Sequence, residues 1–208
     1  MESPLCRADT RLIETFGWDG TALRRLPAHL ARARASAIAL GFVWDRAAIT
    51  RALASVTGEI PLRVRLTIAR NGDAEVTTGP LAPTPPLWHV AVAKDRLNPD
   101  LPLLRHKTTE RALYDRARAT LPGGIDEILF LNSRGEAAEG TITNIFADFG
   151  DGLVTPPLAS GCLPGILRAE LLAGGVAREA AIPARDLPRA RLFVGNALRG
   201  LIPARLST

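Results

Sequence analysis

The chain has 208 residues, of which 47% are hydrophobic and 23% charged, as in ordinary globular proteins. Its net charge of +5 comes from basic residues spread among acidic ones. This argues against nucleic acid as a partner, because a phosphate backbone is bound by clustered Lys and Arg. No apolar run reaches the roughly 18 to 20 residues of a membrane span. We therefore expect no membrane partner. The first residues also lack the apolar segment of a signal peptide.

Cysteine and lysine usage narrows the choice further. Cys6 and Cys162 are far apart in the sequence and fit no metal-binding spacing, so we expect no metal, a reducing compartment and a cytoplasmic protein. Only Lys94 and Lys107 are lysines, so 26 − 2 = 24 of the basic residues are arginine. An ammonium loses its proton far more readily than a guanidinium does. Lys107 is therefore a candidate for chemistry that arginine cannot perform.

The first half of the chain alternates strand and helix patterns. Residues 10–18 are rich in β-branched and aromatic residues and end at the turn signal Asp19-Gly20. Apolar residues at helical spacing follow Pro27, and Gly41 is suited to end that helix. The expected elements are a strand at 10–18 with a short return strand, a helix from Pro27 to Gly41, a helix capped by Asp45 that runs to about Ser55, and strands at 62–69, 74–78 and 88–94, the first two of these joined at Asn71-Gly72.

The second half follows a proline-containing connector. The expected elements are a helix at 108–120, strands at 127–131, 141–147 and 153–155 with turns at 133–135 and 150–152, a helix at 164–172 with proline in its first turn, and closing strands at 191–195 and 201–204. The sequence thus predicts an α+β fold. We expect an N-terminal domain at 1–99, a connector at 100–106 and a C-terminal domain at 107–208.

Lys107 and Glu139 suggest the chemistry of pyridoxal phosphate (PLP). A PLP enzyme needs a primary amine that forms an imine and later moves a proton, and a carboxylate that keeps the pyridine nitrogen protonated. The segment 161–168, with two glycines and a proline before an apolar helix, can supply the free N–H groups of a phosphate site, and Arg32 is a candidate second ligand. Each residue alone also fits a simpler interpretation: Lys107 as a surface lysine at a helix start, Glu139 as a solvated acid at a turn.

The motifs together resemble the class IV aminotransferase family, the fold-type IV PLP enzymes. The resemblance rests on HKTTERALYD, EILFLNSRGEAAEGTITNIF, LVTPPLASGCLPGILR and FVGNALRGL, and reaches back to LIETFGWDG and HLARARASAIALGF. It implies two α/β domains with PLP between them in a homodimer. It also implies the following roles: Lys107 as the Schiff-base lysine, Glu139 as the partner of the pyridine nitrogen, Arg32 with Gly165, Ile166, Asn196 and Ala197 as the phosphate site, and Thr143 and Asn144 beneath the ring.

Within the family, the motifs HKTTxRxxYD and GNxLRG look like the 4-amino-4-deoxychorismate lyase branch. That branch implies elimination of pyruvate to give 4-aminobenzoate, with Arg111 and Arg199 as candidates for binding substrate carboxylates and Thr15 as a catalytic proton relay. Family members usually begin some twenty residues earlier, with a segment that borders the substrate pocket. The alternatives are therefore a transaminase for branched-chain or D-amino acids, and a family member without catalysis.

Overall fold

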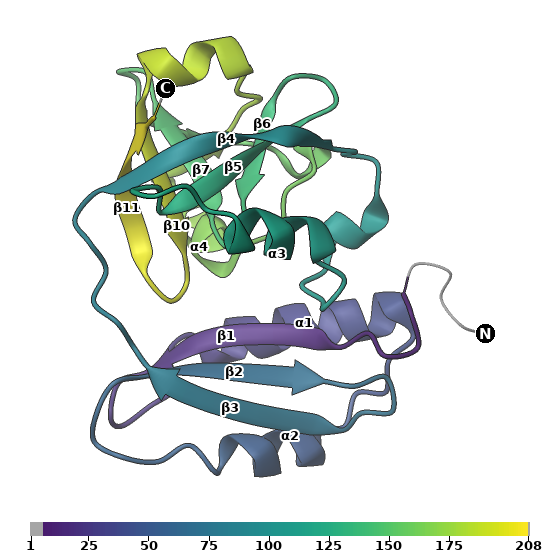
Figure 1. The fold of residues 1–208 in the computed structure, drawn as a ribbon. Helices are drawn as coiled ribbons and strands as arrows, with labels where there is room; N and C mark the ends of the chain where they lie inside the picture. The colour runs from purple at the N-terminus through teal and green to yellow at the C-terminus, as the bar shows by residue number, and fades with distance from the viewer. Residues whose placement is uncertain (1–5, 208) are drawn as a thin grey trace. The chain divides into compact units, whose positions relative to one another are not determined.

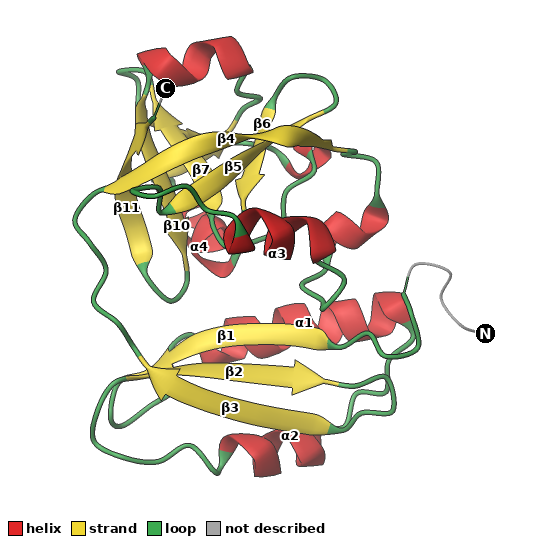
Figure 2. Cartoon of the chain, viewed as in Figure 1, coloured by secondary structure: helices red, strands yellow, loops and turns green. Residues whose placement is uncertain are grey.

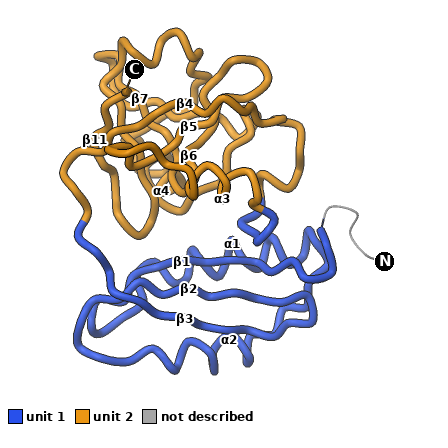
Figure 3. The backbone as a smooth tube through the Cα atoms, viewed as in Figure 1, with its two compact units in different colours: residues 1–83, 106–110 blue, residues 84–105, 111–208 orange. Residues whose placement is uncertain are grey.

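The computed structural model describes residues 6–207, which form a mixture of helices and β-strands (Figures 1 and 2). The predicted α+β class is confirmed. The residues group into two compact units (Figure 3): unit 1 contains residues 1–83 and 106–110, and unit 2 contains residues 84–105 and 111–208. The domain limits at 99 and 107 stay a prediction. No helix among the described residues has both the length and the apolar character to span a membrane.

Unit 1 is built on a three-stranded antiparallel sheet in the order β1 (Leu12–Trp18), β2 (Leu62–Ile68), β3 (Ala74–Pro80). Helix α1 (Leu26–Leu40) packs against β1, and helix α2 (Arg46–Leu53) packs against β3. The short return strand expected after the turn at Asp19 is wrong: only one bridge, between Trp18 and Leu23, follows it. β1 pairs with the distant β2 instead, because seven consecutive residue pairs outweigh a single local one.

Both helices of unit 1 were predicted by local signals. α1 has proline in its first turn, and Gly41 ends it in the left-handed conformation at φ 70°. Its buried positions include Ala33 and Ala37, one turn apart, and these small side chains let the helix approach the sheet closely. α2 begins after Asp45, whose carboxylate accepts from the N–H of Ala48 at 2.9 Å. These start and stop signals are confirmed.

Unit 2 is an eight-stranded mixed sheet in the order β10-β11-β4-β5-β6-β7-β8-β9. Its strands are β4 (Trp88–Leu97), β5 (Glu127–Asn132), β6 (Ala137–Gly140), β7 (Asn144–Asp148), β8 (Leu153–Thr155), β9 (Ala177–Glu179), β10 (Arg191–Asn196) and β11 (Gly200–Leu206). A further pairing of β10 with β7 closes the first six strands of this order into a ring. Closure removes open edges from that part of the sheet.

Strand β5 is buried along its whole length because both of its faces are covered. Leu129 and Leu131 lie in the main core with residues of β7, β10 and β11. Ile128 and Phe130 belong to a second cluster, against which α3 (Ala112–Ala119) packs through Leu113 and Tyr114. This two-sided burial explains why β5 reads as a continuous apolar run rather than an alternating one.

Three predicted elements of unit 2 are wrong in detail. The helix expected at 108–120 begins at Ala112, because Thr108 pairs with Leu12 of β1. The strand expected at 141–147 is a turn followed by β7, and β6 before it was missed because its residues have low β propensity. The helix expected at 164–172 is α4 (Ile166–Ala173) with Gly165 at its N-cap, so Pro164 lies before it.

The rest of the chain adds short elements to unit 2. Three 3₁₀ helices lie in the connections between the larger elements: η1 (Pro102–Arg105), η2 (Leu158–Ser160) and η3 (Ala184–Arg189). Strand β9 was not predicted. The turns at 133–135 and 150–152 contain glycines with positive φ, as expected of hairpin connections. η1 falls within the predicted connector, while β4 extends three residues beyond the strand expected at 88–94.

Candidate active site

Lys107 lies on an extended segment of unit 1 that is bonded to β1. Its carbonyl oxygen accepts from the N–H of Ile13 at 2.8 Å, and the N–H of Thr109 donates to the carbonyl of Arg11 at 2.9 Å. The side chain is half-buried, and α3 begins only at Ala112. The helix start expected at Lys107 is therefore wrong, because the backbone there is hydrogen-bonded to β1, and the chemical role of Lys107 stays a prediction.

Arg32 belongs to a buried charged cluster between α1 and β1. The carboxylate of Glu14, 1% exposed, accepts from Arg32 Nε at 2.9 Å and Arg32 Nη2 at 2.6 Å. It also lies 2.6 Å from His29 Nδ1. Burial raises the pKa of Glu14, but the opposing effect of Arg32 and His29 is larger, so the pKa lies below its usual value. Glu14 thereby fixes the orientation of the predicted phosphate ligand.

Thr15 occupies the next position on β1, where successive side chains point to opposite faces of the sheet. Glu14 faces α1, so Thr15 projects away from the Glu14–Arg32 pair. Thr15 is half-buried and pairs across the sheet with Arg65. Its predicted role as a proton relay stays a prediction.

Glu139 is held from two sides within unit 2. It lies on β6 and is 7% exposed. The Tyr114 hydroxyl donates to Oε1 at 2.6 Å, and the N–H of Leu163 donates to Oε2 at 2.8 Å. Burial and the negative charge of Glu139 both raise the pKa of Tyr114 strongly, so the phenol stays protonated. The interpretation of Glu139 as a solvated acid at a turn is therefore wrong.

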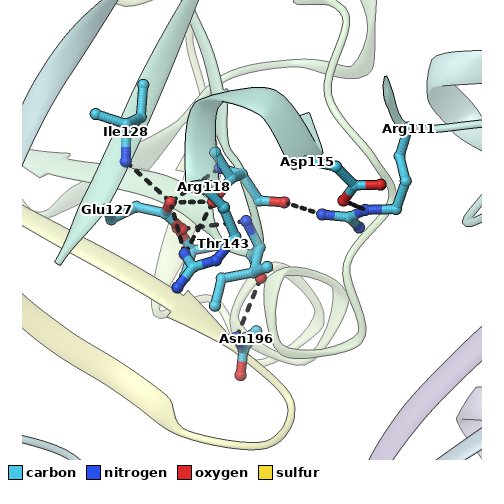
Figure 4. A network of polar contacts seen from close by, with 9 residues as sticks. Arg111, Asp115, Arg118, Glu127, Ile128, Thr143 and Asn196 are labelled. Carbon is cyan, nitrogen blue, oxygen red and sulfur yellow. Dashed lines mark hydrogen bonds and ion pairs between the residues drawn. The ribbon is translucent and has the colours of Figure 1, made fainter. Parts of the chain in front are cut away.

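The turn at 141–143 is organised by a second buried carboxylate, Glu127 (Figure 4). Glu127 is 0% exposed, and its Oε1 accepts from the N–H and the hydroxyl of Thr141. Its Oε2 accepts from the N–H of Ile142 at 3.1 Å and from Thr143 Oγ1 at 2.9 Å. The side chain of Thr143, a predicted cofactor residue, is therefore fixed by its hydrogen bond to Glu127.

Further polar side chains hold the same turn from other elements of unit 2. Asn196 Nδ2 donates to the carbonyl of Ile142 at 3.1 Å, which joins the end of β10 to this turn (Figure 4). Arg118 Nη1 donates to Thr141 Oγ1 at 3.0 Å. Side chains from several elements thus fix the conformation of this turn, which is the preorganisation that a binding site needs.

Three glycines mark places where the backbone of unit 2 is too closely packed for a side chain. A Cβ at Gly165, the N-cap of α4, would overlap Asn144 Oδ1, and one at Gly140 would overlap Thr143 Oγ1. A Cβ at Gly195 would lie 2.8 Å from the side chain of Leu167. The start of α4 therefore packs directly on the Asn144 side chain of β7, and β10 packs on Leu167 of α4. This close packing brings five predicted residues together: Thr143, Asn144, Gly165, Ile166 and Asn196.

This junction fits an anionic group. Gly165 offers no side-chain oxygen to the N–H groups of the first turn of α4, and a helix start without such a cap favours an anion. Asn196 Oδ1 accepts from the N–H groups of Leu198 and Arg199, so the loop that carries Ala197 has a fixed shape. The donors suit the phosphate of PLP, and Glu139, in the same unit, suits its pyridine nitrogen. Residues 6–207 contain no cluster of three or more metal-ligating His, Cys, Asp or Glu side chains.

The two arginines expected to bind substrate already have protein partners. Arg111 Nε donates to Asp115 at 2.8 Å, and Arg111 Nη2 donates to the carbonyl of Thr141 at 2.9 Å. Arg199 Nη1 donates to Thr84 Oγ1 at 3.3 Å, and its guanidinium lies 5.6 Å from the centre of the Trp88 ring. Arg111 therefore helps to shape the 141–143 turn. A role in substrate binding stays a prediction for both residues.

The predicted site residues divide between the units. Lys107, Thr15 and Arg32 belong to unit 1, and the remaining ones to unit 2. Sequence reasoning missed Glu14, Glu127 and Tyr114, which position the others. A signal was present for two of these residues: Glu14 and Glu127 are the charged residues of strands that are rich in apolar residues, and such charges are rarely buried without a specific partner.

The chain is similar in sequence to known proteins. The sequence profile of the family described as "Amino-transferase class IV" matches residues 11–206. A Schizosaccharomyces pombe protein named "Putative aminodeoxychorismate lyase" is 29% identical over 181 residues, which cover 82% of this chain and 77% of that protein.

Two solved structures extend the comparison. A "Putative amino-acid aminotransferase" from Mesorhizobium loti is 49% identical with a TM-score of 0.92, and the match covers 96% of this chain and 100% of that one. The 4-amino-4-deoxychorismate lyase from Pseudomonas aeruginosa is 25% identical with a TM-score of 0.80, and the match covers 94% of this chain and 82% of that one.

Proposed function

The chain belongs to the class IV aminotransferase family, whose members are PLP-dependent enzymes, and we propose that it acts as a 4-amino-4-deoxychorismate lyase. The observation that carries the cofactor assignment is the setting of Glu139, a buried carboxylate held by Tyr114 and Leu163. The choice of the lyase rests on the S. pombe relative, which is named for this activity and matches 82% of the chain.

Lys107 attaches the cofactor in this proposal, and Glu139 binds its pyridine nitrogen. Arg32, the N–H groups of Gly165 and Ile166, and the loop at Asn196 and Ala197 bind the phosphate, while Thr143 and Asn144 lie beneath the ring. When bound, PLP supplies an aldehyde that combines with amines and a ring that takes up electrons from the substrate carbon. Glu14 holds the guanidinium of Arg32 in one orientation through two hydrogen bonds.

The substrate step follows from the amine of Lys107. With PLP bound, the substrate amine would take the place of Lys107 on the cofactor, and the freed amine of Lys107 would remove the proton from the amine-bearing carbon of the substrate. The bond between the substrate ring and the enolpyruvyl oxygen would then break with its electron pair on the oxygen, the ring would become aromatic, and the enolpyruvate would take up a proton to leave as pyruvate. The amine of Lys107 would finally displace the product amine and release 4-aminobenzoate. Arg111 and Arg199 are the proposed ligands of the substrate carboxylates, and Thr15 is the proposed relay of the proton.

A transaminase is the second candidate function. The M. loti structure, 49% identical to this chain, carries the name of an amino-acid aminotransferase. In that reaction no leaving group would depart: Lys107 would deliver the proton to the cofactor, the substrate nitrogen would stay there, and a ketoacid would be released. Both reactions use the same cofactor residues, so the pocket for the substrate side chain decides between them.

The direct test supplies enzymatically prepared 4-amino-4-deoxychorismate to the PLP-loaded protein. The lyase gives 4-aminobenzoate and pyruvate in a 1:1 ratio, and Lys107→Ala gives neither. A transaminase instead gives no 4-aminobenzoate and forms a ketoacid when branched-chain or D-amino acids are offered. We further propose that the enzyme is a cytoplasmic homodimer, which light scattering on the purified protein would test for its oligomeric state.

A further inference from the structure

Tyr114 has a role that the proposed reaction does not yet assign. We propose that it is a positioning residue that acts through Glu139 and keeps a proton on the pyridine nitrogen of the bound cofactor. This inference rests on the proposed role of Glu139 as the partner of that nitrogen. It concerns two residues of unit 2 whose contact is direct: the Tyr114 hydroxyl donates to Glu139 Oε1 at 2.6 Å.

The ring of Tyr114 is held so that its hydroxyl points at the carboxylate. Phe130 of β5 packs against it edge-on, with ring centres 5.2 Å apart. The guanidinium of Arg111 lies 5.6 Å from the centre of the same ring, within the range of a cation–π interaction. α3 therefore presents one defined hydroxyl to Glu139, and the 2.6 Å distance is typical of a charge-assisted hydrogen bond.

The phenol remains a donor under all working conditions. Burial, the charge of Glu139 and the hydrogen bond itself all raise the pKa of Tyr114 far above neutrality, although Arg111 opposes them. Burial and Glu139 likewise raise the pKa of the Cys162 thiol to about 12, so no second anion competes beside the carboxylate. Two neutral donors of unit 2 therefore reach Glu139: the phenol at Oε1 and the Leu163 N–H at Oε2.

Two hydrogen-bond donors make a carboxylate a weaker base, because they stabilise its charged form. A proton shared between Glu139 and the pyridine nitrogen then lies on the nitrogen, which is the form of the ring that accepts electrons from the substrate. Removal of the Tyr114 hydroxyl raises the basicity of Glu139 and moves the proton toward the carboxylate. The expected result is a fall in kcat of roughly ten-fold, the effect of one such hydrogen bond, with little change in KM.

The test is the ¹⁵N NMR shift of the pyridine nitrogen of ¹⁵N-labelled PLP in the wild-type enzyme and in Tyr114→Phe. Phenylalanine keeps the packing on Phe130 and removes only the hydroxyl. The shift is expected to move toward that of an unprotonated pyridine. Thr120→Val is a matched control, since it removes a hydroxyl at the end of the same helix that bonds only to the carbonyl of Arg116, and it should leave the shift unchanged.

Glu139→Gln distinguishes a wrong role of Glu139 from a wrong role of Tyr114. If neither Glu139→Gln nor Tyr114→Phe moves the ¹⁵N shift, the assigned role of Glu139 is wrong and the inference falls with it. If Glu139→Gln moves the shift and Tyr114→Phe does not, only the role of Tyr114 is wrong. Tyr114 is the only tyrosine of the chain, so 3-fluorotyrosine supplied during expression replaces it alone. Its more acidic phenol is a stronger donor, and the ¹⁵N shift should not move in the unprotonated direction.

Discussion

Glu14 in unit 1 and Glu127 in unit 2 are both buried carboxylates on strands, yet their charge is compensated in different ways. Glu14 is bonded to the guanidinium of Arg32 and the imidazole of His29. Glu127 is bonded mainly to neutral groups, the N–H and hydroxyl groups of residues 141–143, while the guanidinium of Arg118 lies 3.5 Å from it.

The difference shows two uses of a buried charge. A carboxylate bonded to a guanidinium fixes the direction of a cation, which suits a side chain proposed to bind phosphate. A carboxylate bonded to several neutral donors fixes the shape of a turn, because each N–H group can reach it from one backbone conformation only. Glu14 therefore orients one side chain, that of Arg32, whereas Glu127 fixes the conformation of three residues, 141–143.

Glu127→Ala is expected to have the largest effect, a loss of about 4 kcal/mol in the free energy of unfolding. It leaves several buried N–H and hydroxyl groups without an acceptor, each at about 1–3 kcal/mol before the structure relaxes. Urea unfolding followed by circular dichroism measures it. Glu59→Ala, at an exposed position, is the matched control and should change the free energy by less than about 0.5 kcal/mol. Equal losses in the two variants would contradict the role of Glu127.

Glu14→Gln is expected to cost about 3 kcal/mol at neutral pH, because the guanidinium of Arg32 loses the negative charge of Glu14 in a buried site. The pKa of Glu14 is lower in the folded protein than its unfolded value of about 4.3, so the stabilisation is present above that pH. It is lost as the pH falls through the lower, folded value. The difference between wild type and Glu14→Gln in urea unfolding should therefore shrink below about pH 4.3. A difference that stays constant down to pH 3 would exclude this electrostatic account.

Gly165→Ala tests the junction between the start of α4 and β7, where a Cβ would overlap Asn144 Oδ1. Asn144 or the backbone must move, at a cost of about 2 kcal/mol in the free energy of unfolding, and PLP should bind more weakly. Fluorescence titration with PLP measures the second effect. Gly123→Ala is the control, since its Cβ would meet no atom within 4 Å, and affinity for PLP should not change there. Unchanged PLP affinity in Gly165→Ala would remove the start of α4 from the phosphate site.

The sequence predicted those elements whose signals are local. Pro27, Gly41 and Asp45 set the ends of helices through neighbouring residues, and these helices formed as expected. The start of α3 was wrong because Thr108 has a partner, Leu12, nearly a hundred residues away. No local pattern carries such information.

The same distinction applies to the site. Lys107 stood out because arginine replaces lysine almost everywhere else, and Glu139 because it lies in a motif. The contacts of Tyr114 and Glu127 could not be predicted, since their partners lie 25 and 14–16 residues away and meet them only after the strands pair.

Asp45→Ala is expected to have the smallest effect and extends the comparison to a carboxylate with one local bond. It removes the cap on the Ala48 N–H and should cost about 1 kcal/mol in the free energy of unfolding. Asp45→Asn retains an acceptor and should recover most of that loss, as thermal unfolding would show. If Asn is no better than Ala, the cap is not the source of the effect.

The central claim, that Lys107 carries the cofactor, is tested most directly by borohydride reduction of the PLP-loaded protein followed by peptide mass spectrometry. The chain offers only two lysines, and Lys94 is exposed on β4, so it serves as an internal control. We expect a stable pyridoxyl group on Lys107 in the wild type and in Lys94→Arg, and none on either lysine in Lys107→Ala. A pyridoxyl group on Lys94, or wild-type turnover by Lys107→Ala, would contradict the account.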